Sequence, residues 1–110
     1  MSESQTITGT VALCSAADVS DGSIQSAVLP DGTRVALYNV GGRIYATVDL
    51  CTHGEASLSE EGTLEGTVVE CGWHFGRFDV TTGAACGAPC TTPLRTYPVA
   101  LIEGIVHVTV

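Results

Sequence analysis

The chain has 110 residues, of which 45% are hydrophobic and 15% charged, a balance typical of one compact domain over residues 1–110 and not of a disordered segment. Twelve acidic residues oppose four arginines, lysine is absent, and the net charge is −8. A surface of this charge repels nucleic acid and anionic membranes, so neither is an expected partner. The charge suits docking onto a basic protein, or it only keeps the chain soluble.

The N-terminal residues Met1–Thr6 contain neither a basic start nor an apolar stretch, so we expect no signal peptide. No apolar run approaches the ~20 residues needed to cross a bilayer. These features predict a cytoplasmic protein. Because a reducing cytosol disfavours stable disulfides, the five cysteines require another explanation.

Short β-branched runs, each closed by Gly, Asp or Pro, recur along the chain and indicate short antiparallel strands. The expected strands are, in chain order, Thr6–Leu13, Ile24–Leu29, Thr33–Val40, Arg43–Val48, Thr63–Glu70, Arg77–Val80, Leu94–Ile102 and Ile105–Val110. Helix signals are limited to single turns at Ala16–Ser20 and Glu55–Leu58. The pattern predicts an all-β sandwich or small barrel, with Phe78 in its core.

Two segments, Asp49–Glu61 and Cys71–Pro93, do not fit the strand pattern. Together they hold four of the five cysteines and two of the three histidines. Loops on a rigid β scaffold often carry function. We therefore expect the functional site in these two loops.

The loops contain two Cys–His pairs, Cys51-Thr52-His53 and Cys71-Gly72-Trp73-His74. A single cysteine is more often a small buried hydrophobe than a ligand, and a single histidine is more often a hydrogen-bonded core residue. Two such pairs, each at loop spacing, make coincidence a poor explanation. The pairs predict a metal centre with Cys51, His53, Cys71 and His74 as ligands.

Two kinds of metal centre use these ligand types. A structural zinc site takes two thiolates and two imidazoles, but zinc fingers group the cysteines at one end and the histidines at the other. Here each loop contributes one of each. That arrangement suits a two-iron centre in which one iron takes both thiolates and the other takes both imidazoles. A zinc module used for protein interaction stays as the alternative.

The ligand segments resemble the two cluster loops of the Rieske family. They read C-T-H-G-E-A-S-L at Cys51–Leu58 and C-G-W-H-F-G-R-F-D at Cys71–Asp79, and they resemble in particular the ferredoxin components of bacterial ring-hydroxylating dioxygenase systems. Further similarity lies in Thr82-Gly83, Ala88-Pro89 and Tyr97-Pro98-Val99. The resemblance implies a Rieske-like antiparallel β-sandwich with a loop-built, cluster-binding subdomain.

The resemblance also implies one 2Fe–2S cluster, with Cys51 and Cys71 on its inner iron and His53 and His74 on its outer iron. It implies a monomeric one-electron carrier and not an enzyme. The carrier would accept electrons from an NADH-dependent flavoprotein ferredoxin reductase and pass them to a terminal aromatic-ring oxygenase. The alternative is the small Rieske subunit of another oxidoreductase, such as a nitrite-reductase-like complex.

Departures from the family pattern indicate which branch of the family the chain resembles. Rieske proteins of cytochrome bc complexes carry one further cysteine in each loop, joined as a disulfide, whereas the equivalent positions here hold Ala56 and Trp73. The chain therefore resembles the low-potential ferredoxin branch. Gly72 stands where many relatives have proline, and we expect the glycine to loosen the second loop.

Acidic residues gather between the two ligand pairs. They are Glu55, Glu60, Glu61, Glu65 and Glu70. Such a run is usually a solvated face. Beside an exposed redox centre, it is alternatively the rim that a basic partner recognises.

Overall fold

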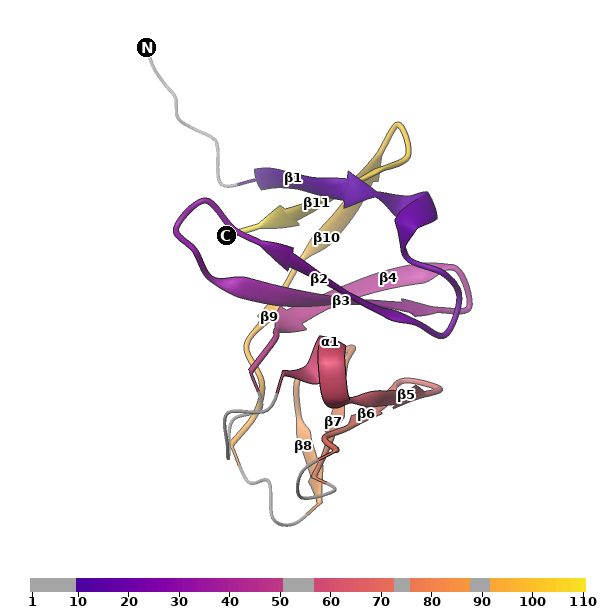
Figure 1. Ribbon diagram of the computed structural model, residues 1–110, viewed down its shortest axis with the longest axis vertical. Helices are drawn as coiled ribbons and strands as arrows, with labels where there is room; N and C mark the ends of the chain where they lie inside the picture. Colours follow the sequence, from indigo (N-terminus) through magenta and orange to yellow (C-terminus); the bar gives the residue numbers. More distant parts are fainter. Residues whose placement is uncertain (1–9, 51–56, 73–75, 88–91) are drawn as a thin grey trace.

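The computed structural model describes residues 10–50, 57–72, 76–87 and 92–110. Within these ranges the protein consists almost entirely of short strands joined by tight turns (Figure 1). The strands are β1 (Thr10–Ser15), β2 (Ile24–Val28), β3 (Arg34–Val40), β4 (Arg43–Val48), β5 (Thr63–Glu65), β6 (Val68–Glu70), β7 (Arg77–Asp79), β8 (Ala85–Gly87), β9 (Thr96–Tyr97), β10 (Val99–Ile102) and β11 (Ile105–Thr109). A 3-10 turn, η2 (Ala16–Asp18), and a single helical turn, α1 (Leu58–Glu61), complete the described elements. No helix among them is long and apolar enough to cross a membrane.

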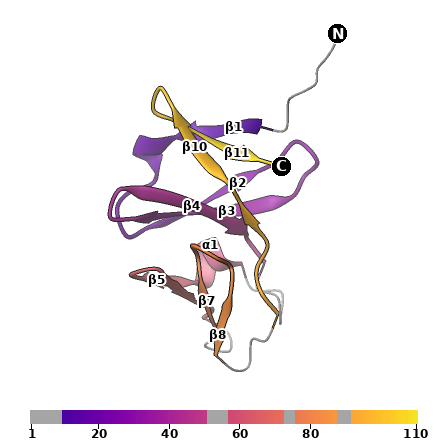
Figure 2. The same cartoon turned by 180° about the vertical axis from the view of Figure 1, so that it is seen from behind.

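The strands form three antiparallel sheets, with the orders β1-β11-β10, β2-β3-β4-β9 and β5-β6-β7-β8. Figures 1 and 2 show the first sheet at the end of the molecule near the N-terminus and the second sheet in the middle. The third sheet and α1 lie at the opposite end. The predicted all-β antiparallel architecture is confirmed.

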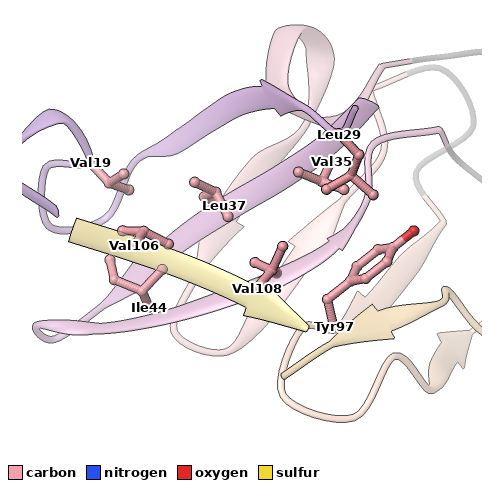
Figure 3. Close-up of a cluster of buried hydrophobic side chains, with 9 residues drawn as sticks. Val19, Leu29, Val35, Leu37, Ile44, Tyr97, Val106 and Val108 are labelled. Carbon is pink, nitrogen blue, oxygen red and sulfur yellow. The ribbon is translucent and has the colours of Figure 1, made fainter. Parts of the chain in front are cut away.

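Strand β3 lies between two hydrophobic cores, because successive side chains of a strand point to opposite faces. Its four central residues, 35–38, are 0% exposed. One face contributes to the sandwich core (Figure 3), which consists of Val19, Leu29, Val35, Leu37, Ile44, Ala46, Tyr97, Val106 and Val108. The other face contributes to the loop core, which consists of Ala36, Tyr38, Leu58, Val69, Cys71, Phe78, Val80 and Leu94. The middle sheet therefore supports both ends of the molecule.

The phenol of Tyr38 is the polar group that β3 brings into the loop core. Its hydroxyl donates a hydrogen bond of 2.7 Å to Thr47 Oγ1, which itself donates to the carbonyl of Val48 at 2.8 Å. Burial raises the pKa of Tyr38 well above its ordinary value, so the phenol stays protonated. The buried hydroxyls are thus satisfied within the middle sheet.

The predicted strand over Thr63–Glu70 is wrong, because that segment is the β5–β6 hairpin. Leu64 pairs with Val69 across it, and the turn begins at Gly66, whose φ of +61° favours glycine. The alternation of apolar residues continues through the turn, so the sequence pattern alone does not reveal that the strand ends there. The glycine was the available signal.

Other elements differ by smaller amounts. Strands β2, β3, β4, β7 and β11 agree with their predicted bounds to within one residue. The segment expected as Leu94–Ile102 divides at Pro98 into β9 and β10, because proline lacks the N–H that a continuous ladder needs. Strand β8 was not expected, since its Ala-Cys-Gly sequence has no β-branched residue. The start of the first predicted strand, residues 6–9, lies outside the described residues.

Candidate metal centre

Cys71 is the predicted ligand that lies within the described residues. Its side chain is 1% exposed, and it belongs to the loop core together with Leu58 and Phe78. The other three predicted ligands, Cys51, His53 and His74, lie outside the described residues, as do Ala56 and Trp73. What the structure shows of the site is therefore Cys71 and the residues at the bases of the loops.

The first ligand loop is closed at its base by main-chain contacts. Leu50 and Ser57 form an antiparallel bridge on either side of residues 51–56. One residue further out, the Leu58 amide donates a 2.7 Å hydrogen bond to the Asp49 carbonyl. The chain therefore leaves β4 and returns to α1 at one place, which fixes both ends of the loop.

The second ligand loop is closed in the same way. The Cys71 amide donates a 2.8 Å hydrogen bond to the carbonyl of Gly76, and β6 and β7 pair directly behind it. Cys71 thus stands at the junction between a regular hairpin and its loop. A buried thiol at such a junction suits a sulfur ligand on the protein side of a cluster.

The third segment, residues 88–91, follows β8, and the described chain resumes at Thr92. The Leu94 amide then donates a 2.7 Å hydrogen bond to the Gly83 carbonyl. Leu94 belongs to the loop core, as do Leu58 after the first loop and Cys71 at the start of the second. The loop core therefore includes a described residue that flanks each of the three segments.

A residue that the sequence interpretation missed is Asp49, two positions before Cys51. It is 1% exposed, and its Oδ1 accepts a 2.8 Å hydrogen bond from the Ser59 amide. Its Oδ2 accepts a 2.6 Å hydrogen bond from the Ser57 hydroxyl. The same oxygen lies 3.4 Å from Arg34 Nη2, with which it forms an ion pair. The Ser57-x-x-Glu60 capping pattern marks the start of the helical turn beside the loop, but it does not point to Asp49.

Gly72 has no room for a side chain. A Cβ at this position would overlap the main-chain carbonyl oxygen of Glu61 at the end of α1. A backbone carbonyl cannot swing aside as the tip of a long side chain can. Close packing of the second loop against α1, and not looseness, therefore explains the glycine.

We expect Gly72→Ala to lower the free energy of unfolding by about 1–3 kcal/mol, the usual cost of overpacking a closely packed site. Denaturant unfolding of the cluster-loaded protein measures this change. The control is Gly66→Ala, where a Cβ meets no atom within 4 Å and only the positive φ is unfavourable. Only Gly72→Ala should also alter the cluster's absorption spectrum; identical spectra for both variants would contradict the close approach.

The acidic residues near the loops are partly neutralised by arginines. Arg34 Nη2 lies 3.3 Å from Glu60 Oε2, and Arg77 Nε lies 3.5 Å from Glu70 Oε2. Both arginines are well exposed, so each pair contributes little to stability. Their effect is on the surface potential, because each reduces the net negative charge beside a loop base.

Comparison with known proteins agrees with this geometry. The model of the Rieske [2Fe-2S] domain matches residues 9–98, and the chain belongs to the Rieske [2Fe-2S] family. It is 51% identical to the ferredoxin component of the p-cumate 2,3-dioxygenase system of Pseudomonas putida over 108 residues, which are 98% of this chain and 92% of that protein.

Solved structures show the same likeness. The ferredoxin of Sphingomonas yanoikuyae B1 is 40% identical, with a TM-score of 0.87 over 92% of this chain and 98% of that one. A chain from the complex of reduced oxygenase and oxidised ferredoxin in carbazole 1,9a-dioxygenase is 44% identical, with a TM-score of 0.85 over 92% and 93%. The cofactor of a Rieske domain is one 2Fe–2S cluster. The buried Cys71 thiol and the closed loop bases fit that cluster.

Proposed function

We propose that this protein is a one-electron carrier that passes electrons from an NADH-dependent flavoprotein reductase to the terminal oxygenase of an aromatic-ring dioxygenase system. The observation that carries the proposal is the 51% identity to a dioxygenase ferredoxin component, over 98% of this chain and 92% of that relative. Other relatives with the same role serve naphthalene dioxygenase systems and are 50% identical over 84 residues.

Within this function we propose that Cys51 and Cys71 hold the inner iron and that His53 and His74 hold the outer iron. When bound, the 2Fe–2S cluster supplies a site that gains and loses one electron. The burial of Cys71 supports its inner position, because a thiolate there is shielded from water. Two thiolates balance the charge of the oxidised core while imidazoles add none, which is why Rieske centres lie at roughly −150 to +300 mV.

We propose that the reductase and the oxygenase bind this protein in turn at the same end, which carries the third sheet and the ligand loops. We call this the loop end of the molecule. The solved ferredoxin–oxygenase complex of the carbazole system supports the second partner by analogy. A chain of net charge −8 is steered toward a basic surface, although Arg34 and Arg77 offset two of the glutamates.

We also propose that the chain works as a single-domain monomer in the cytoplasm. The two cores share β3, which supports one cooperative unit over the described residues. Cys14 and Cys86, which have no proposed ligand role, form no disulfide among the described residues, as is usual in a reducing compartment.

Electron transfer should depend on salt. With NADH, a ferredoxin reductase and a terminal oxygenase from a related dioxygenase system, stopped-flow absorbance should show the cluster bleaching and then recovering. We expect the rate to fall at least about fivefold between roughly 0.02 and 0.5 M salt, because the screening length shrinks from about 20 to about 4 Å.

A matched pair of variants locates the effect on the surface. Glu60, 64% exposed on α1, lies beside the first loop, whereas Glu103 lies in the β10–β11 turn at the far end. Glu60→Gln should weaken the salt dependence and Glu103→Gln should leave it unchanged. A carrier that neither accepts nor delivers electrons would refute the proposed function, and a flat salt response in an active carrier would refute only the acidic surface.

A further inference from the structure

Asp49 joins the end of β4 to the start of α1 through both its main chain and its side chain. The Asp49 carbonyl accepts from the Leu58 amide, and its amide donates to the Arg34 carbonyl at 3.0 Å. Its carboxylate binds the Ser59 amide and the Ser57 hydroxyl, as described above. These partners follow residues 51–56, whereas Asp49 precedes them, so the contacts cross the base of the first ligand loop.

The carboxylate stabilises a helical turn that is too short to persist alone. Helix α1 has four residues, and isolated helices of that length are unstable in water. Its first amides need partners: the Ser57 hydroxyl accepts from the Glu60 amide at 3.3 Å, and Asp49 accepts from the Ser59 amide. Asp49 also binds the Ser57 hydroxyl itself and so fixes the capping side chain.

The same helical turn contacts the second ligand loop at its other end. Leu58, 0% exposed, lies in the loop core with Cys71. The Glu61 carbonyl lies against the Cα of Gly72, so closely that a Cβ there is excluded. A shift of α1 therefore reaches the second loop directly, through a packed side chain and a rigid backbone contact.

We propose that Asp49 is the positioning residue that sets the first cluster loop against the second, acting through α1. The proposal rests on the ligand assignment given under the proposed function. A carboxylate is required because both of its oxygens accept hydrogen bonds, from an amide on one side and a hydroxyl on the other. Asparagine has the same shape, but its amide nitrogen cannot accept, and Arg34 loses its buried counter-charge.

Asp49→Asn in the cluster-loaded protein tests this role. We expect the cluster to be lost at least tenfold faster at a fixed temperature, followed by its visible absorbance. The EPR lines of the reduced protein should broaden, because the ligand loops then adopt a wider range of relative positions. Hydrogen exchange of the Ser59 amide should accelerate at least tenfold, which is a readout independent of electron transfer.

The matched control is Asp79→Asn. Asp79 Oδ1 accepts from the Thr81 amide at 2.9 Å and from the Thr81 hydroxyl at 2.6 Å, so it makes the same two kinds of bond in the β7–β8 turn. That turn lies at the end of β7 away from Gly76, and this variant should keep the wild-type rate of cluster loss and the wild-type EPR line shape.

A second variant keeps the test decisive if Asp49→Asn does not fold. Ser57→Ala removes one of the two hydrogen bonds that the Asp49 carboxylate accepts and also the capping bond to the Glu60 amide. It leaves the bond from the Ser59 amide to Asp49, so it should accelerate cluster loss by a smaller factor, with faster exchange in α1. If Asp49→Asn folds, adding Ser57→Ala to it should have less effect than Ser57→Ala alone, because the two residues share a hydrogen bond.

Two results would overturn the proposal. One is a rate of cluster loss in Asp49→Asn within twofold of the rate in Asp79→Asn, and the other is a rate in Ser57→Ala within twofold of wild type. A His53→Ala variant that keeps a normal cluster would instead overturn the ligand assignment.

Discussion

Replacing His53 or His74 with alanine is expected to abolish the Rieske EPR signal of the reduced protein and to reduce bound iron well below two atoms per chain. Each substitution removes one of the two imidazoles proposed for the outer iron. A methyl group supplies no replacement donor, and water is a poor substitute in a site built for neutral nitrogen ligands. Iron and sulfide analysis together with EPR measure the loss.

The third histidine provides the control. His107 lies on β11, opposite Ala12 of β1 and Ala100 of β10, in the sheet farthest from the loops (Figures 1 and 2). His107→Ala should therefore retain full iron content and an unchanged EPR signal. If His53→Ala or His74→Ala gave the same spectrum as His107→Ala, the ligand assignment would be wrong.

Phe78→Ala is expected to lower the free energy of unfolding by about 3–5 kcal/mol, the usual cost of deleting a fully buried aromatic side chain. Phe78 is 0% exposed, pairs with Val69 in the third sheet, and lies in the loop core with Cys71. A cavity at this position would remove packing from beneath the ligand loops. Denaturant unfolding of the cluster-loaded protein, followed by far-UV circular dichroism and cluster absorbance, measures the change.

Leu101→Ala serves as the control for Phe78→Ala. Leu101 is 51% exposed on β10, so its truncation should change stability by no more than about 0.5 kcal/mol. In Phe78→Ala, the loss of cluster absorbance should coincide with the loss of secondary structure. A variant as stable as Leu101→Ala would show that Phe78 does not support the loop core.

Local patterns predicted most of the middle sheet. Strands β3 and β4 were predictable because their β-branched runs end at the glycine and aspartate turns. The β5–β6 hairpin was missed because Leu64 and Val69 fit one continuous alternation as well as two paired strands. Only the pairing of β6 with β7 makes the turn at Gly66 necessary, and pairing is a tertiary property.

Paired Cys–His motifs require little context, so four ligands could be proposed from the sequence, and that assignment stays a prediction. Phe78 proved to be a core residue as expected. The support around the ligands was not predictable. Asp49 matters through Ser57 and Ser59, which local sequence rules do not connect to it across a loop. Gly72 is required because the Glu61 carbonyl, eleven positions earlier, leaves no room for a Cβ. No periodic pattern in the sequence predicts that contact.

The position of β3 limits how the cluster-bearing end can be transplanted. Ala36 and Tyr38 face the loop core, while Val35 and Leu37 face the sandwich core on the same strand. A graft of the third sheet and its loops alone would leave their hydrophobic residues without the β3 face that covers them. A graft that included β3 would expose its other face. The smallest portable redox module is therefore the loop end together with the whole middle sheet and the sheet that covers it.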